Sequence, residues 1–140
     1  MRLEHINMVV SDMDETLRFY SAAFPHWIIR MRGMANWYGV QRQWLHFGDD
    51  YNYLTFNDSG KSTPRDLHSN DLGIAHLGFE INNLAALRER MAVVGFTPSH
   101  TGAEHPHRRN TYYIDPNGVE VEFVEYLSDI PAQRNQSEEI

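Results

Sequence analysis

Residues 5–13 read HINMVVSDM, and residues 76–84 repeat the pattern as HLGFEINNL, each copy opening on a histidine. Apolar residues alternate with others over the first positions, as in a strand with one buried face. An aspartate or asparagine follows, a residue type that commonly caps a helix. The offset from His5 to His76 is 71 residues, and the same offset joins Met13 to Leu84. The chain is therefore predicted to contain one structural unit twice.

The pattern around each copy predicts the order β-α-β-β-β. In the first half we expect a strand at 2–10, a helix at about 14–24, and strands at 27–31, 40–47 and 51–56. In the second half we expect a strand at 73–81, a helix that is capped by Asn82 or Asn83 and runs to about 94, and strands at 96–99, 110–114 and 119–126. The predicted organisation is a single α+β domain at 1–126, made of module one (1–57), a polar linker (58–72) and module two (73–126). A polar tail at 127–140 is expected to be ordered only in part.

The composition is ordinary for a globular domain, with 41% hydrophobic and 22% charged residues. We expect a cytoplasmic protein with no membrane segment, because no apolar run approaches the roughly 18 residues that a spanning helix needs, and the first residues lack secretory features. The net charge of −7 argues against nucleic acid as a partner. The chain has no cysteine, so any metal must be held by nitrogen and oxygen ligands.

Strand alternation predicts that three polar side chains point away from the helices. Alternate residues of a strand share a face, and the apolar sets of these strands are expected to pack under the helices. His5, His76 and Glu122 then take the opposite, concave side. Two imidazoles and a carboxylate are typical ligands of mononuclear non-haem iron and also suit other divalent metals. Either histidine alone is more simply a solvated polar residue, but both at equivalent positions, with Glu122 in phase, favour a metal site.

Two motifs extend this interpretation. Residues 5–20, HINMVVSDMDETLRFY, place a histidine before a strand and a helix that ends in Phe-Tyr, and residues 115–125, DPNGVEVEFVE, place a DPxG turn before a glutamate. These motifs resemble the opening and the closing of vicinal-oxygen-chelate proteins, the superfamily of glyoxalase I, extradiol dioxygenases, fosfomycin-resistance thiol transferases and bleomycin-binding proteins. The resemblance covers about residues 1–126. It implies two βαβββ modules that form a cupped mixed sheet around one divalent metal ion on His5, His76 and Glu122.

The resemblance also implies that a small substrate with neighbouring oxygens chelates the metal, which acts as a Lewis acid. Fe²⁺ or Mn²⁺ is favoured, and Ni²⁺, Co²⁺ or Zn²⁺ would also suit the ligands. Glyoxalase I has a second ligand glutamate on the last strand of its first module, and Tyr53 aligns with it here. A phenol, with a pKa near 10, replaces a carboxylate base poorly. Three protein ligands leave room for a bidentate substrate and dioxygen, as in extradiol dioxygenases.

The sequence also offers candidate catalytic and substrate-binding residues. Tyr112 lies ten residues before Glu122, as a tyrosine does in extradiol dioxygenases, although β-propensity explains a strand tyrosine equally well. Tyr53 is the second catalytic candidate, next to the metal. The substrate-binding candidates are Trp44, Arg42, Arg109 and His107. Trp44 belongs to an aromatic cluster that core packing explains equally well. The two arginines and His107 are also typical of solvent-exposed surface positions.

Three functions remain open. The three-ligand set favours a dioxygenase-like oxidoreductase. A glyoxalase-like lyase or isomerase, or a fosfomycin-type thiol transferase, is the alternative. A metal-free small-molecule binding protein is the third, and the intact set of ligands argues against it. A homodimer is expected in each case, because exposed sheet edges are normally paired or covered and twofold dimers are the commonest solution.

Overall fold

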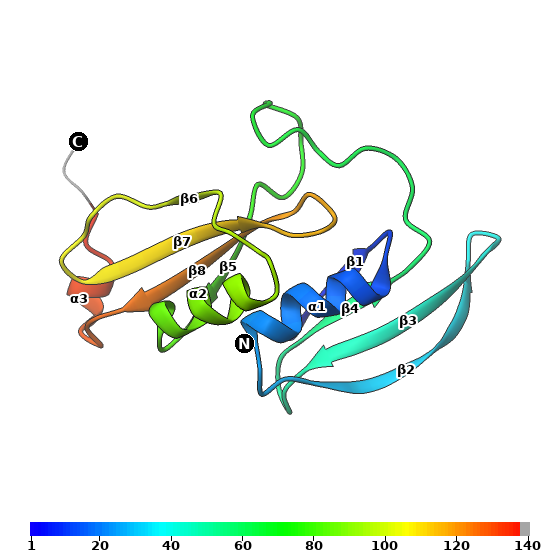
Figure 1. The fold of residues 1–140 in the computed structure, drawn as a ribbon, viewed down its shortest axis with the longest axis horizontal. Coiled ribbons are helices and arrows are strands. Elements are labelled where there is room, and N and C mark those ends of the chain that lie inside the picture. Colours follow the sequence, from blue (N-terminus) through cyan, green and yellow to red (C-terminus); the bar gives the residue numbers. More distant parts are fainter. Residues whose placement is uncertain (138–140) are drawn as a thin grey trace. The chain divides into compact units, whose positions relative to one another are not determined.

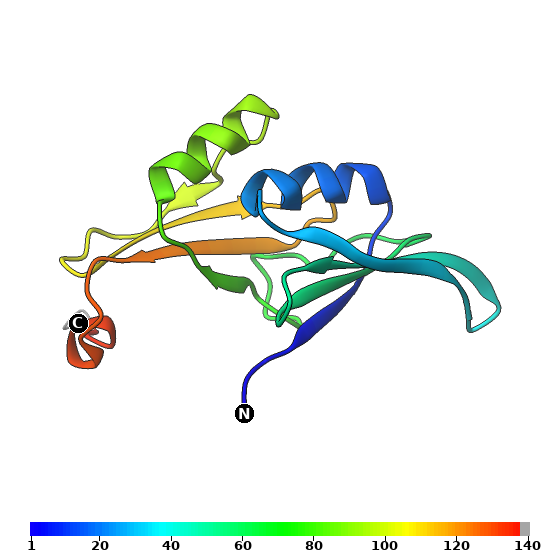
Figure 2. The ribbon, with the colours of Figure 1, turned by 90° about the horizontal axis from the view of Figure 1, so that it is seen from below.

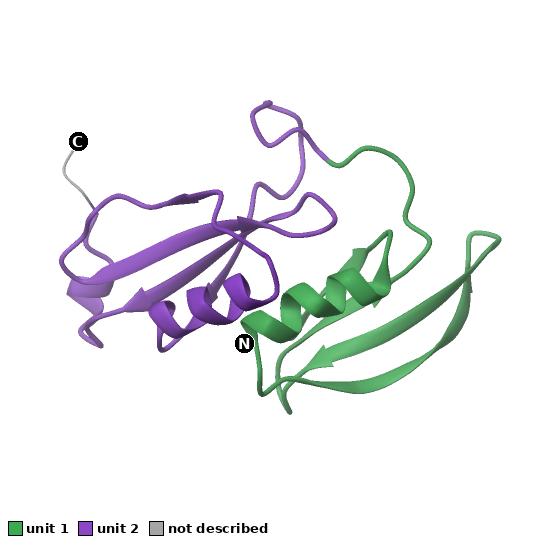
Figure 3. Cartoon of the chain, in the orientation of Figure 1, with its two compact units in different colours: residues 1–64 green, residues 65–140 purple. Residues whose placement is uncertain are grey.

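The computed structural model describes residues 1–137 as two compact units, unit 1 over residues 1–64 and unit 2 from residue 65 onward (Figure 3). In each unit one helix lies along one face of a four-stranded sheet (Figures 1 and 2). The β-α-β-β-β order that the repeat predicted is present twice, which confirms the predicted fold of two βαβββ modules.

Unit 1 is built from five elements. They are β1 (His5–Val9), α1 (Met13–Ala23), β2 (Ile28–Trp37), β3 (Val40–Gly48) and β4 (Tyr53–Asn57). The strand order across the sheet is β1-β4-β3-β2. β1 runs parallel to β4, and the other pairs are antiparallel. The first strand along the chain therefore lies beside the last, and both present their side chains to the same two faces.

Unit 2 repeats this arrangement. Its elements are β5 (Leu77–Glu80), α2 (Leu84–Val93), β6 (His100–Thr101), β7 (Arg108–Ile114) and β8 (Glu120–Tyr126), in the sheet order β5-β8-β7-β6. A short helix, α3 (Pro131–Arg134), follows in the predicted tail, and Arg134 forms an ion pair with Glu80 at 2.7 Å. The last part of that tail, 138–140, lies outside the described residues.

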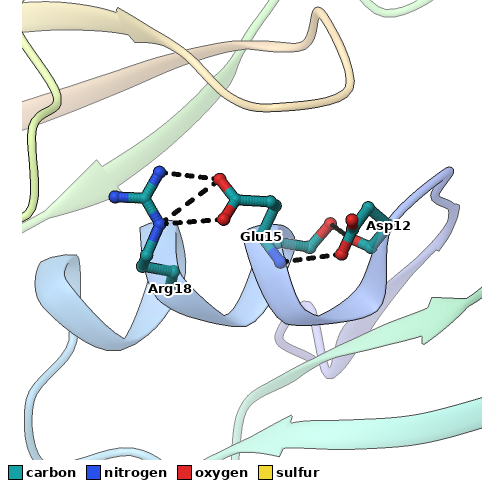
Figure 4. A network of polar contacts seen from close by, with 4 residues as sticks. Asp12, Glu15 and Arg18 are labelled. Atoms are coloured by element: carbon teal, nitrogen blue, oxygen red, sulfur yellow. Dashed lines mark hydrogen bonds and ion pairs between the residues drawn. The ribbon is translucent and has the colours of Figure 1, made fainter.

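The starts of the two long helices are fixed by equivalent caps. The Asp12 carboxylate accepts a hydrogen bond from the Glu15 amide at 3.0 Å, and Glu15 pairs with Arg18 at 2.6 Å within the same helix (Figure 4). In unit 2 the Asn83 side chain accepts from the Ala86 amide at 2.9 Å. Both caps satisfy amides that have no partner inside the helix. As a result, α1 and α2 begin at residues separated by the same 71 positions as His5 and His76.

The core of each unit lies between its helix and its sheet. In unit 1 buried side chains of α1 face buried side chains of β3 and β4, and the pattern recurs in unit 2 with α2, β7 and β8. The buried apolar residues of these elements are Phe19, Tyr20, Ala23, Leu45, Phe47, Leu54 and Phe56 in unit 1, and Leu84, Leu87, Met91, Tyr113, Val121 and Phe123 in unit 2. The opposite face of each sheet is left for polar residues.

Several predicted bounds were wrong. β2 continues to Trp37, beyond the predicted end at residue 31, because Tyr38 and Gly39 form a two-residue hairpin turn with positive φ angles of 51° and 83°. Tyrosine seldom occupies such a position, so the turn has no sequence signal. Tyr51 belongs to a turn rather than a strand, since the Asp49 carboxylate accepts from its amide.

In unit 2, β5 begins at Leu77 rather than at residue 73, so His76 lies directly before the strand. The predicted strand at 96–99 is absent, and a two-residue strand pairs with β7 at His100–Thr101 instead. Of the helices in residues 1–137, none combines the length and the apolar character needed to cross a membrane.

Candidate functional site

In unit 1 the sheet face opposite α1 carries a stack of aromatic rings. Tyr53 pairs with His5 across β1 and β4, and their ring centroids are 4.7 Å apart with nearly parallel planes. On its other side Tyr53 stacks on His46 of β3 at 4.6 Å. The Arg30 guanidinium lies 4.5 Å from the Tyr53 ring centroid. The Tyr53 ring is therefore held between two imidazoles with a cation nearby.

The two histidines of this stack have different environments. Burial, followed by the positive charge of Arg30, lowers the pKa of His46, which favours its neutral form. The His5 Nδ1 atom lies 3.0 Å from the Glu4 carboxylate. A carboxylate on Nδ1 fixes the tautomer and directs Nε2 outward, which is the usual arrangement of a histidine that binds a metal.

Unit 2 places His76 and Glu122 together on the equivalent face. The His76 Nε2 atom is 3.2 Å from the Glu122 carboxylate, and its Nδ1 atom is 3.8 Å from that of Glu120. His76 thus has a carboxylate on its Nδ1 side, as His5 does. Glu122 projects from β8 between the buried Val121 and Phe123, so the alternation that the sequence predicted holds in this strand.

Two further side chains of β7 surround Glu122. The Asn110 amide donates a hydrogen bond to the Glu122 carboxylate at 2.8 Å and a second to the Tyr112 hydroxyl at 3.2 Å. Burial, then hydrogen bonding to Glu122 and its charge, raises the pKa of Tyr112. Its ring stacks on His100 at 4.2 Å and meets His76 edge to face at 5.8 Å. Tyr112 is consequently a protonated phenol beside both candidate ligands of unit 2.

The strand registers correct the sequence alignment of Tyr53 with Glu122. Glu122 lies opposite Gly78, two residues after His76, and opposite Tyr112 on β7. In unit 1 the residue two after His5 is Asn7, whose partner on β4 is Thr55. Thr55 also lies opposite His46 on β3. By register, Thr55 corresponds to Glu122 and His46 to Tyr112, whereas Tyr53 occupies the position next to His5.

The expected substrate-binding residues are distributed over several places. Trp44 lies on the same face as His46, with ring centroids 5.2 Å apart. Arg42 shares that strand and donates to the Asp58 backbone oxygen at 3.3 Å. Arg109 alternates with Asn110 and Tyr112 along β7, so it lies on the opposite face of the sheet, contrary to the expectation that it meets the substrate.

His107 precedes β7, where its amide hydrogen-bonds to the His105 ring at 3.1 Å. Within the described part of the chain, no contact joins it to His76, Tyr112 or Glu122. His107 therefore lies in a loop, in contact with His105.

Sequence reasoning missed several polar residues of these faces. His46 could have been found, because it alternates with Trp44 in a predicted strand. Asn110 could also have been found from its phase with Tyr112. His100 could not, since it lay outside the predicted strand at 96–99. The roles of Glu4 and Glu120 depend on side-chain distances that no sequence pattern gives.

Each unit taken alone holds fewer than three candidate ligands. Within unit 1 or within unit 2, residues 1–137 contain no group of three His, Asp or Glu side chains that could hold a metal ion. Unit 1 offers His5, and unit 2 offers the neighbouring pair His76 and Glu122. Within the described residues, neither unit by itself therefore supplies the three ligands that the sequence predicted.

Comparison with known proteins agrees with this repeat-based architecture. The model of the Glyoxalase/Bleomycin resistance protein/Dioxygenase superfamily matches residues 2–123. The chain belongs to that superfamily. No curated protein matches it. The resemblance seen in residues 5–20 and 115–125 is therefore confirmed at the level of the superfamily.

Solved structures of this superfamily share the fold at low sequence identity. A glyoxylase/bleomycin resistance protein/dioxygenase domain from Frankia sp. EAN1pec is 20% identical, with a TM-score of 0.73 over 97% of this chain and 98% of that one. A glyoxalase family protein from Enterococcus faecalis is 17% identical, with a TM-score of 0.72 over 89% and 97%. A mutant of the fosfomycin resistance protein FosX from Listeria monocytogenes, complexed with Mn(II) and 1S,2S-dihydroxypropylphosphonic acid, is 16% identical, with a TM-score of 0.70 over 96% and 98%.

Proposed function

We propose that the chain is a metal-dependent enzyme of this superfamily that acts on a small molecule with two neighbouring oxygens. In this proposal His5, His76 and Glu122 hold one divalent ion, with Fe²⁺ or Mn²⁺ favoured. The observation that carries the proposal is the approach of His76 Nε2 to the Glu122 carboxylate at 3.2 Å, beside the hydroxyl of Tyr112. The favoured reaction is a dioxygenase-like oxidation.

The donor atoms fit such an ion. Nitrogen and oxygen ligands bind divalent metals at about 2.1 Å, so two ligands at right angles are separated by about 3 Å. The 3.2 Å between His76 and Glu122 is close to that separation. The carboxylates of Glu4 and Glu120 lie on the Nδ1 sides of His5 and His76, which leaves the Nε2 atoms for the metal. When bound, the metal would supply Lewis-acid stabilisation of charge on substrate oxygen.

The protein side chains have separate tasks in this proposal. Tyr112 keeps its proton because its pKa is raised, and a substrate oxygen that displaces Glu122 as its acceptor would receive this hydrogen bond. Asn110 holds the Glu122 carboxylate and the Tyr112 hydroxyl in fixed positions through its amide. The stacked rings of Tyr53 and His46, with Trp44 tilted beside them, offer aromatic contacts for a substrate.

The residues of β4 favour an oxygenase over a glyoxalase-like isomerase. The positions of β4 on the polar face are Tyr53, Thr55 and Asn57, none of which carries a carboxylate. The fourth ligand and proton carrier of glyoxalase I has no counterpart there, whichever of these positions is taken as equivalent. A fosfomycin-type transferase is the second candidate, because the FosX relative that shares the fold is complexed with Mn(II).

Protein purified without chelators tests the proposal. Elemental analysis is expected to find about one iron or manganese per chain, since a two-histidine, one-carboxylate set suits these ions. The same sample is then assayed with catechols under air, with the hemithioacetal of methylglyoxal and glutathione, and with fosfomycin and a thiol. Oxygen consumption with a catechol supports the favoured reaction. Efficient isomerisation of the hemithioacetal with nickel or zinc contradicts it, and the absence of any metal contradicts the whole proposal.

We also propose that the protein is a homodimer. β2 lies at the edge of the unit 1 sheet and exposes a series of apolar side chains, Ile28, Ile29, Met31 and Met34. A long apolar edge strand is normally paired or covered. Light scattering at micromolar concentration is expected to return twice the chain mass of 16.3 kDa. A mass equal to that of one chain contradicts this proposal.

A further inference from the structure

A cavity of about 750 Å³ lies within unit 2, beside the first residues of β7, and His76, Tyr112 and Glu122 are not among its lining residues. Its walls are the start of α2, the loop at 102–106 that follows β6, and the first residues of β7. Its volume falls within the range of small-molecule sites. The charged residues of its lining are Arg88, Arg108, Arg109, His105 and Glu104.

Among residues 1–137, no acidic side chain forms an ion pair with the three guanidinium groups of this cavity, those of Arg88, Arg108 and Arg109. Arg108 donates to the backbone oxygens of residues 134 and 136. The chain has 19 acidic and 12 basic residues, so carboxylates are plentiful. Three arginines on one cavity without an ion pair are therefore unusual for so acidic a chain.

Two acidic residues lie near these arginines in the fold, Glu125 on β8 and Glu104 in the cavity lining. Glu125 lies opposite Arg109 in the β7–β8 register, but its carboxylate accepts a hydrogen bond from the Leu84 amide at the start of α2, at 3.3 Å. Glu104 is the one acidic residue in the cavity lining among residues 1–137. The lining therefore carries three arginines against one glutamate, which leaves its net charge positive.

We propose that this cavity binds a small organic anion that carries a carboxylate or phosphate group. Guanidinium groups match both groups through paired, charge-assisted hydrogen bonds. The apolar side chains of Leu84 and Leu127 in the same lining suit the carbon skeleton of such a ligand. Arg109, which faces away from Glu122, thus contributes to a second site rather than to the metal site.

The cavity and the metal site share one wall residue. Asn110 lines the cavity and also donates to Glu122. The Gly102 backbone packs so closely against the Asn110 amide that a Cβ at position 102 would lie 1.8 Å from it. Gly102 of the loop therefore packs directly on the Asn110 side chain, which contacts both the cavity and Glu122. Variants of Arg88 and Arg109 leave this residue intact, so they separate anion binding from metal binding.

The experiment titrates the purified full chain with inorganic phosphate and, separately, with succinate. Calorimetry gives the affinity, and amide chemical shifts locate the site. Saturable binding with millimolar or tighter affinity is expected, with the largest shift changes at 102–109. The double variant Arg88→Gln/Arg109→Gln should weaken binding by roughly tenfold or more, because two charge-assisted hydrogen-bond donors are lost. Arg90→Gln, also on α2 but outside the lining, is the matched control.

The outcomes separate this site from the metal site. His76→Ala should bind both anions as the unmodified protein does, because His76 does not line the cavity. No saturable binding of either anion overturns the proposal, as does equal weakening by Arg90→Gln. Loss of binding in His76→Ala also overturns it, because the anion would then depend on the metal site. Preference for phosphate over succinate, or the reverse, decides which anionic group the ligand carries.

Discussion

Replacing His76 by alanine is expected to abolish stoichiometric metal binding while the protein stays folded. The imidazole supplies one of the three proposed ligands, and its Nε2 atom already lies 3.2 Å from the Glu122 carboxylate. A site left with two protein ligands should bind the metal on the order of 100-fold more weakly or worse, since even the loss of an outer partner of a ligand costs 10- to 100-fold. Calorimetric titration of metal-free protein with Mn²⁺ or Fe²⁺ measures this change.

The fold should tolerate the substitution. The His76 side chain is 41% exposed and precedes β5, so its removal leaves no cavity in the core. The melting temperature is therefore expected to change little. His68→Ala, in the polar segment of unit 2 before β5, is the matched control and should bind metal normally. If His76→Ala keeps its affinity, His76 is not a ligand, and the proposed site is wrong even if the protein binds metal elsewhere.

Most of the fold was predictable because each unit repeats a local pattern. The caps Asp12 and Asn83 fixed the helix starts within one residue, and the alternation around Glu122 gave the buried face of β8. The misplaced bounds arise where backbone geometry overrides residue preference. The turn at Tyr38 uses a positive φ that tyrosine rarely adopts, and β6 is a two-residue strand with no periodicity of its own.

The candidate site was predictable only in its repeated part. His5, His76 and Glu122 could be chosen from motif and phase, but they remain proposed ligands. The position that corresponds to Glu122 in unit 1 was misassigned, because the register between β1 and β4 depends on the length of the intervening turns rather than on the repeat offset. Side-chain alternation places a residue on a face, but does not say which neighbour it contacts.

The two units carry different residues at positions that the repeat makes equivalent. Each carries a histidine at the start of its first strand and an aromatic or imidazole ring on the neighbouring strands. In unit 2 the residue two positions after His76 pairs with Glu122, which carries a carboxylate. In unit 1 the residue two positions after His5 pairs with Thr55, which carries none. At the equivalent position, unit 1 therefore has a neutral hydroxyl, and its neighbouring rings are those of Tyr53 and His46.

Replacing Tyr112 by phenylalanine is expected to lower turnover by about 100-fold while metal affinity changes only a few fold. The substitution removes the hydroxyl that contacts Glu122 and Asn110 but keeps the ring that stacks on His100. A positioned proton donor is typically worth 10²- to 10⁴-fold in rate. The measurement is kcat with the substrate that the assays identify, together with calorimetric metal affinity. Tyr126→Phe, at the far end of β8, is the control and should keep its activity.

The same change at Tyr53 distinguishes the two tyrosines. Tyr53→Phe keeps the stack between His5 and His46. The free energy of metal binding should therefore weaken by at most the roughly 1–2 kcal/mol of one hydrogen bond. If Tyr53→Phe loses the metal altogether, Tyr53 is a ligand, and the case for a three-ligand oxygenase fails. If Tyr112→Phe loses metal in parallel with turnover, its hydroxyl supports Glu122 rather than the substrate. If Tyr112→Phe binds metal normally but turns over slowly, the result supports a direct role for the Tyr112 phenol proton in the reaction.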